Sequence, residues 1–260
     1  MQKILIVEDN KTLAKLISRK IEDSLEFKVD VAYSLHEAKL FLHKYNYFVT
    51  LLDINLPDAP NGEVVDYVVS RGEHAIVLSG NIDKEFRKKI LKKNIIDYVN
   101  KSGVDDIKYI IQNIQRLQKN QNHKILVVDD SMVMRKQLKI TLENMFFNVI
   151  AVAHGEEALE MIELHKDIAL VLTDYNMPVM DGLELVCEIR KKYNKQMLNI
   201  IALSSDEDEE TVAIFLKKGA NDYIKKPFSK EEFSCRIHNS IEAIENINLL
   251  SSMNIDFNDL

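Results

Sequence analysis

The residues that could do chemistry occur twice in this chain of 260 residues, in the same order and at nearly the same spacing. Each set has an acidic pair after an apolar run, a lone aspartate after another run, and then a serine and a lysine. The first set is Glu8, Asp9, Asp53, Ser79 and Lys101, and the second is Asp129, Asp130, Asp174, Ser204 and Lys226. A repeat of this length predicts two domains, each large enough to bury its own core.

Three carboxylates, a lysine and a hydroxyl together form a site that can receive a phosphoryl group. Carboxylates a few ångströms apart repel one another, so at least one pKa rises unless a cation is present. An all-oxygen cluster suits Mg²⁺, which prefers carboxylates, water and a substrate phosphate. One carboxylate can attack phosphorus in line while the metal and the lysine neutralise charge on the equatorial oxygens. The product would be an aspartyl phosphate.

Alternating strands and helices must bring these residues together. In both halves, continuous apolar runs rich in Ile, Val and Leu alternate with segments of helical spacing, which is typical of strands buried on both faces of a parallel sheet. The expected strands are Ile4–Val7, Phe27–Ala32, Phe48–Leu52, Ala75–Leu78, Ile95–Val99, Ile125–Val128, Phe147–Val152, Ile168–Leu172, Asn199–Leu203 and Asp222–Ile224. Each half is therefore predicted to be a flavodoxin-like α/β domain, a five-stranded parallel sheet with helices on both faces. Polar residues of such a sheet gather at the carboxyl ends of its strands.

The domain boundary is expected at the polar run Lys119–Asn122. The sequence thus predicts a first domain at 1–119, a linker at 120–122 and a second domain at 123–245. An amphipathic helix from about Lys230 to Leu250 carries an apolar stripe longer than one small domain needs. Residues 246–260 are expected to be a helix extension followed by a linker, Ser251–Leu260, to an output domain beyond Leu260.

Composition excludes several classes of protein. No apolar run approaches the roughly 20 residues of a membrane span and no signal peptide opens the chain, so the cytoplasm is the expected location. Residues 1–120 hold 19 basic and 17 acidic residues, and residues 121–260 hold 15 and 24. Neither half is expected to bind nucleic acid, because such domains are usually strongly basic. No glycine-rich loop follows either first strand, which argues against a conventional nucleotide-binding enzyme.

Taken jointly and in duplicate, these motifs resemble two tandem receiver domains of bacterial two-component response regulators. The resemblance covers residues 1–245. It implies that Asp53 and Asp174 accept a phosphoryl group from a phosphohistidine on a sensor histidine kinase or a phosphotransferase.

The resemblance also implies roles for the other residues of each set. Asp9 and Asp130 would bind Mg²⁺ directly, while Glu8 and Asp129 would act largely through water. The remaining implied roles are the backbone carbonyls of Asn55 and Asn176 as metal ligands, and Ser79, Lys101, Ser204 and Lys226 as groups that bind the phosphoryl oxygens.

Two tyrosines stand three residues before the lysines, where the family has a rotating aromatic ring. The resemblance implies that Tyr98 and Tyr223 turn inward when the serine moves toward the phosphate. The phosphorylation would then change the surface formed by the fourth helix, fifth strand and fifth helix of each domain. Plain packing of a tyrosine at a strand end is the alternative.

The two halves differ in how closely they fit the family. After Asp174 the second half reads Tyr-Asn-Met-Pro-Val-Met-Asp-Gly, and Lys226 precedes Pro227, a bond that is cis in the family. The first half is one residue longer between Asp53 and the glycine, and Ser102 replaces the proline. Asp174 is therefore predicted to be phosphorylated. Asp53 is also predicted to be phosphorylated, and the alternative for the first half is an adaptor domain without phosphate.

The end of the chain bears on the output. Asp259-Leu260 matches the first letters of the Asp-x-Leu-Thr-Gly motif that commonly opens a diguanylate cyclase domain. The leading hypothesis is the regulatory part of a PleD-like protein in c-di-GMP signalling. The alternative is a self-contained receiver pair that signals by binding a partner protein. The residues given would form a regulatory module, and whether the full-length protein is an enzyme stays open.

Phosphorylation is expected to control formation of a homodimer. The segment Asp206–Glu210 is acidic at the start of the fourth helix of the second half, and Lys217 and Lys218 lie at its end. Opposite charges on one face permit a two-fold pairing. Ordinary placement of charges at helix ends is the alternative.

Overall fold

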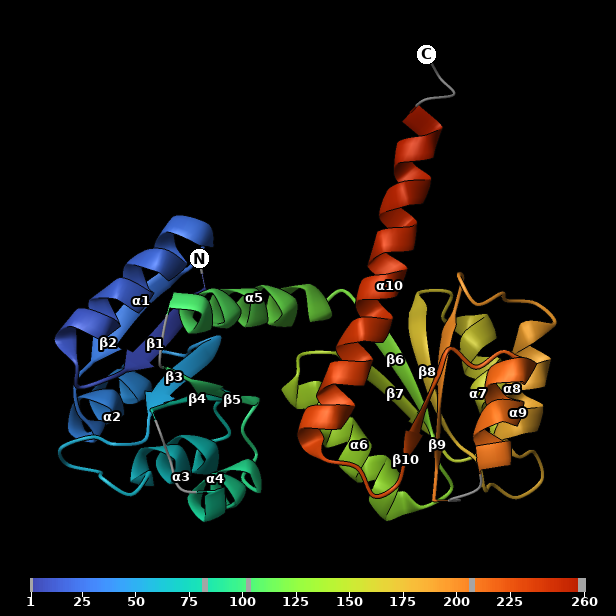
Figure 1. Cartoon of the computed structure of the whole chain (residues 1–260), viewed down its shortest axis with the longest axis horizontal. Helices are drawn as coiled ribbons and strands as arrows, with labels where there is room; N and C mark the ends of the chain where they lie inside the picture. The colour runs from blue at the N-terminus through green and yellow to red at the C-terminus, as the bar shows by residue number, and fades with distance from the viewer. Residues whose placement is uncertain (1, 81–83, 102–103, 206–208, 257–260) are drawn as a thin grey trace. The chain divides into compact units, whose positions relative to one another are not determined.

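The computed structural model of the protein describes residues 2–80, 84–101, 104–205 and 209–256. The chain divides into two compact units, Met1–Lys119 and Asn120–Leu260, each with its own sheet (Figure 1). Ser102, Asp206–Asp208 and Asp259, which the sequence singled out, lie outside the described residues.

Strands and helices alternate throughout the described part of the first unit. The elements are β1 (Lys3–Val7), α1 (Lys11–Ser24), β2 (Lys28–Ala32), α2 (Leu35–Lys44), β3 (Val49–Asp53), α3 (Glu63–Ser70), β4 (Ala75–Ser79), α4 (Lys84–Leu91), β5 (Asp97–Asn100) and α5 (Val104–Asn120). The strands form one parallel sheet in the order β2-β1-β3-β4-β5.

The second unit repeats this arrangement. Its elements are β6 (Lys124–Val128), α6 (Met132–Asn144), β7 (Asn148–Val152), α7 (Gly155–Leu164), β8 (Ile168–Asp174), α8 (Gly182–Arg190), β9 (Asn199–Ser204), α9 (Glu209–Lys218), β10 (Asp222–Lys225) and α10 (Lys230–Asp256). The order β10-β9-β8-β6-β7 is that of the first sheet read from the other edge, and all pairs are parallel. The predicted flavodoxin-like fold is confirmed in both units.

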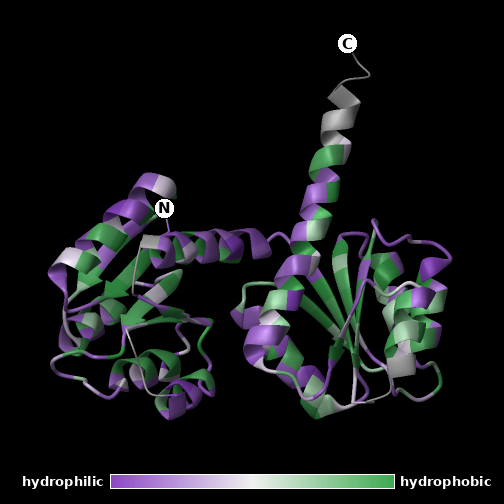
Figure 2. Cartoon of the chain, in the orientation of Figure 1, coloured by the Kyte–Doolittle hydropathy of each residue, from purple (hydrophilic) through white to green (hydrophobic). Residues whose placement is uncertain are grey.

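The central strands are buried along their whole length and mostly apolar, because helices cover both of their faces. Every residue of β3 and β4 is buried, and so is every residue of β9. Figure 2 shows the apolar sheets inside each unit and hydrophilic outer faces on helices such as α1 and α6. Burying each large aliphatic side chain contributes about 2 kcal/mol to folding. None of the described helices is long and apolar enough to cross a membrane.

The register of the sheets places the polar residues at one edge. Val7 pairs with Leu52 across β1 and β3, so the residues that follow them, Glu8 and Asp53, are neighbours. Val128 pairs with Thr173 across β6 and β8, which brings the following residues of the second unit together in the same way. The site of each unit is thus set by the pairing of its first and third strands.

The linker expected at Ser251–Leu260 is wrong over most of its length, because α10 continues to Asp256. The segment contains no glycine or proline that would end the helix. Ile237, Ile241 and Ile244 are buried against the second unit, whereas Leu250 is 61% exposed. The helix therefore extends beyond the segment that is held by apolar contacts.

The short linker at 120–122 is bound to the second unit. Asn120 is buried, and its side chain donates a hydrogen bond to the carbonyl of Met145 at 2.8 Å. The side chain of Asn148 donates to the carbonyl of Gln121 at 2.6 Å. These bonds order the linker backbone on the second unit.

Candidate functional site

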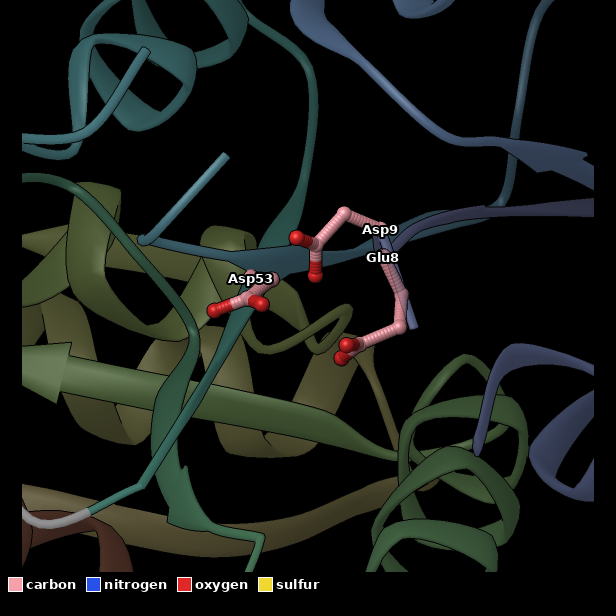
Figure 3. Close-up of side chains that lie close together, drawn as sticks. All are labelled: Glu8, Asp9 and Asp53. Atoms are coloured by element: carbon pink, nitrogen blue, oxygen red, sulfur yellow. The ribbon is translucent and has the colours of Figure 1, made fainter. Parts of the chain in front are cut away.

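Three carboxylates of the first unit meet at the carboxyl edge of its sheet. Glu8 and Asp9 follow β1, Asp53 ends β3, and one oxygen of each lies within 4.8 Å of the others. Figure 3 shows the three side chains projecting into the same space from these two neighbouring strands. Glu8 and Asp53 are buried, and Asp9 is exposed to solvent. The set offers only oxygen ligands with one open side, which fits Mg²⁺.

The second unit has the same cluster. Asp129, Asp130 and Asp174 each bring one carboxylate oxygen within 4.8 Å of the others. Asp129 is buried, Asp174 is 9% exposed, and Asp130 is exposed to solvent. The donor set and the open side again fit a magnesium ion.

A lysine joins two carboxylates in each cluster. The Nζ atom of Lys101 lies 2.6 Å from Asp53 and 2.8 Å from Glu8. The Nζ atom of Lys226 lies 2.8 Å from Asp174 and 2.9 Å from Asp129. The Lys226–Pro227 bond is cis, as the resemblance implied. The missing proline in the first unit does not keep Lys101 from its carboxylates.

Burial and charge act against each other on these groups. Burial raises the pKa of Glu8, and the neighbouring charge of Asp53 adds to this rise while the Lys101 hydrogen bond opposes it. Burial also raises the pKa of Asp174, against the effect of Lys226. Burial alone would lower the pKa of Lys101, but its hydrogen bonds to Asp53 and Glu8 outweigh this and raise it. Each cluster has three carboxylates but one ammonium group, which pairs with two of them, so an added cation would relieve the repulsion.

The predicted serines and asparagines occupy corresponding positions in the two units. Ser79 and Ser204 end β4 and β9, the strands next to those that carry Asp53 and Asp174, and both serines are buried. The main-chain N–H of Asn55 donates to Asp53 at 3.1 Å. Asn176 is exposed, two residues after Asp174. The structure therefore brings the predicted acidic residues and lysine of each set into contact and places the serine on the adjacent strand.

The two tyrosines have different surroundings. Tyr223 is 9% exposed, and its ring centroid lies 6.5 Å from that of Phe215 on α9. Tyr98 is half-buried, and the guanidinium of Arg87 lies 5.3 Å from its ring centroid. Tyr223 thus belongs to the core of its unit, whereas Tyr98 lies under a surface cation.

Two residues make contacts in the loops after Asp53 and Asp174 that the sequence did not reveal. A Cβ on Gly182 would lie 2.1 Å from the carbonyl oxygen of Asp174. In the first unit, the carboxylate of Asp58 accepts the main-chain N–H groups of Leu35 and His36 at the start of α2, each at 2.9 Å. The extra residue in the first loop was the available signal, but its contact with α2 is not visible in the sequence.

Comparison with known proteins settles the family. The sequence model described as the response regulator receiver domain matches residues 4–115 and 125–238. The chain belongs to the response regulator receiver family. The expected tandem of two receiver domains is confirmed. Receivers serve phosphorylation-dependent signalling, are phosphorylated by histidine kinases or phosphotransferases, and generally bind Mg²⁺ at acidic residues.

Similar receivers occur alone and in larger proteins. The chemotaxis protein CheY homolog of Campylobacter jejuni is 38% identical over 109 residues, which are 42% of this chain and 84% of the relative. The alkaline phosphatase synthesis transcriptional regulatory protein PhoP of Bacillus subtilis is 38% identical over 116 residues, 45% of this chain and 47% of PhoP. The crystal structure of a two-component system response regulator/GGDEF domain protein matches this chain with 37% sequence identity and a TM-score of 0.81. It covers 94% of this chain and 100% of that one.

Proposed function

We propose that both receiver domains accept a phosphoryl group from a phosphohistidine donor, on Asp174 and on Asp53. The observation that carries this proposal is the position of each aspartate between an acidic cluster and a lysine, in both units. A carboxylate held in this way can attack phosphorus, because the lysine favours its ionised form.

The metal would be held by the three carboxylates of each cluster and one backbone carbonyl. When bound, Mg²⁺ neutralises charge on the phosphoryl group that is attacked. The proposed ligands are Glu8, Asp9, Asp53 and the carbonyl of Asn55 in the first domain, and Asp129, Asp130, Asp174 and the carbonyl of Asn176 in the second.

The chain's own residues supply the rest of the reaction. A carboxylate oxygen of Asp174 forms a bond to phosphorus as the P–N bond of phosphohistidine breaks and its electron pair stays on the imidazole. Lys226 then pairs with the phosphoryl oxygens in place of the free carboxylate, and the hydroxyl of Ser204 donates a hydrogen bond to another phosphoryl oxygen. Lys101 and Ser79 take these roles around Asp53.

The geometry of the first domain favours a second phosphoacceptor over a pure adaptor. Lys101 lies as close to Asp53 as Lys226 does to Asp174, although the first domain lacks the proline after its lysine. The side chain of Asp53 is 3% exposed and that of Asp174 is 13% exposed. Deeper burial should slow the first site without abolishing its reaction.

Phosphorylation of the full chain by a small donor tests this proposal. With phosphoramidate and Mg²⁺, intact mass spectrometry should detect two phosphoryl adducts on the parent chain. Asp174→Asn and Asp53→Asn should each remove one adduct, and Asp23→Asn, an exposed control on α1, should remove none. An unmodified parent chain would contradict the proposal. A single adduct that is lost only in Asp174→Asn would favour the adaptor role for the first domain.

The proposed output of the pair is a diguanylate cyclase, which makes c-di-GMP. It is supported by the likeness to the response regulator/GGDEF domain protein over nearly the whole chain. The coding frame beyond Leu260 should then continue into a GGDEF domain. A stop codon directly after Leu260 would leave the alternative, a receiver pair that signals by binding another protein.

Phosphorylation would act on the output through the surface of α9, β10 and α10. Tyr223 on β10 packs against Phe215 of α9, so a rotation of the Tyr223 ring would change the packing of that helix. The expected consequence is a homodimer. Light scattering with and without beryllofluoride and Mg²⁺ should detect a doubling of mass, and a monomer in both states would contradict it.

A further inference from the structure

Arg135 on α6 binds the backbone of the acidic pair in the second receiver. Its Nη1 atom donates to the carbonyl of Asp129 at 2.5 Å and lies 3.3 Å from the carbonyl of Asp130. The residue is half-buried, five positions beyond Asp130. No ion pair between Arg135 and a carboxylate occurs among the residues that the structure describes. The guanidinium thus binds the main-chain carbonyls of Asp129 and Asp130 and does not occupy their carboxylate oxygens.

The two peptide groups that Arg135 binds lie past the end of the sheet. Strand β6 ends at Val128, and beyond it the N–H of Asp129 donates to Val152 at 3.3 Å. Among the described residues, no strand pairs with the peptide groups that follow Asp129 and Asp130, although the N–H of Ser131 donates to the Asp129 carboxylate at 2.9 Å. Because these planes decide where the two carboxylates point, the donor that holds them also decides the shape of the acidic cluster.

The first receiver has no arginine at the corresponding position. Its residue at the position of Arg135 is Ala14, which is buried in the core. The side chain of Asn10 there accepts N–H groups of Thr12 and Leu13, both at 3.1 Å. In the second receiver, Ser131 caps the helix with one bond of 3.4 Å. The side-chain cap of α6 thus makes one hydrogen bond where that of α1 makes two, and Arg135 supplies further hydrogen bonds to the turn before α6.

We propose that Arg135 is a positioning residue for the metal site of the second receiver. By fixing the peptide groups of Asp129 and Asp130, it holds their carboxylates toward Asp174 before a cation binds. This role rests on the proposed function, since it concerns the same carboxylates. Without Arg135 the ion must order the turn itself, which costs affinity.

Magnesium binding to the full chain tests the role directly. In an Asp53→Asn background, which leaves the second cluster intact, Mg²⁺ is titrated and followed through amide NMR shifts. The dissociation constant should rise about tenfold in Arg135→Gln and by a smaller factor in Arg135→Lys, which keeps the charge but lacks the planar guanidinium. Lys136→Gln, an exposed neighbour, is the matched control and should change nothing. In an Asp174→Asn background, Arg135→Gln should leave binding at the first cluster unchanged.

The outcomes separate positioning from simple charge. If Arg135 acted only as a cation that repels Mg²⁺, Arg135→Gln would bind more tightly and Arg135→Lys would match the parent, which would overturn the proposal. Constants for both variants within about twofold of Lys136→Gln would also overturn it. If Arg135→Gln fails to fold, Arg135→Lys alone decides. No saturable binding by the parent would overturn the proposed function together with this role, whereas binding by the parent and unchanged variants would remove only the role of Arg135.

Discussion

The two receivers carry the same chemical groups on differently built loops. In the second domain the glycine that follows the proposed phosphoacceptor, Gly182, lies so close to Asp174 that any side chain would strike its carbonyl oxygen. In the first domain Gly62 has a φ of 77°, and an added Cβ would meet its nearest neighbours at 3.4 Å. The same motif glycine is therefore needed for close approach in one domain and for a left-handed backbone in the other.

The extra residue in the first loop has a structural use. The longer loop carries Asp58, whose carboxylate accepts two N–H groups at the start of α2. At the start of α7 in the second domain, His154 makes no side-chain capping bond, and the loop carries Val179, which is 86% exposed. A longer loop after the phosphoacceptor thus binds a neighbouring helix without disturbing the lysine and the acidic cluster.

The largest expected effect distinguishes the two glycines. Gly182→Ala should destabilise the second domain by about 3 kcal/mol, because the new methyl group meets backbone that cannot move away. Gly62→Ala should cost the first domain about 1 kcal/mol for its backbone conformation. Urea unfolding followed for each domain would measure both. Equal losses would contradict the distinction between close approach and backbone conformation.

Removing the lysines should affect the first domain more than the second. Lys101→Met leaves Glu8 and Asp53 without their ammonium group, and these carboxylates are 1% and 3% exposed. We expect a loss of about 2 kcal/mol there and about 1 kcal/mol for Lys226→Met, whose partner Asp174 is better hydrated. Thermal unfolding in EDTA tests the order, and added Mg²⁺ should recover part of each loss. A larger loss for Lys226→Met would reverse the comparison.

Neutralising the second phosphoacceptor should stabilise the metal-free protein. The pKa of Asp174 is raised, chiefly by burial, so its charge opposes folding at neutral pH. Asp174→Asn should therefore gain about 1 kcal/mol in EDTA. The gain should vanish as the pH falls through the folded pKa, since the native carboxyl then takes up a proton. At a free Mg²⁺ concentration about ten times the dissociation constant, Mg²⁺ should stabilise the parent by about 1.4 kcal/mol and the variant much less. A destabilised variant in EDTA would show that the Lys226 pair outweighs burial.

The smallest effect concerns the cap on α2. Asp58→Ala should cost the first domain about 1 kcal/mol, while Val179→Ala in the second should change stability little. Burial acts to raise the pKa of Asp58, but the hydrogen bonds from Leu35 and His36 together outweigh it and lower the pKa. The contribution is therefore complete above the ordinary value of 3.8 and is lost as the pH falls through the lower folded pKa. Chemical unfolding at neutral and acid pH measures it, and a loss independent of pH would argue against the charged cap.

Much of the fold and the candidate site could be predicted because both follow from local patterns. The ten apolar runs became the ten strands of the described sheets, with boundaries shifted by one or two residues. The acidic pairs, Asp53, Asp174 and the lysines came together because parallel strands of one sheet end at one edge. The end of α10 was misplaced because the segment from Ser251 is polar but holds no residue that stops a helix.

By itself, the sequence determined which groups each receiver offers and the order of the elements that carry them, since periodicity and residue type are properties of short stretches of chain. Only the tertiary structure decided how those groups are held. The contact of Arg135 with the acidic turn, of Asp58 with α2 and of Gly182 with Asp174 each depends on a distance of a few ångströms between separate elements. Such distances are set by packing and backbone geometry, and they differ between two domains that share one fold and one set of motifs.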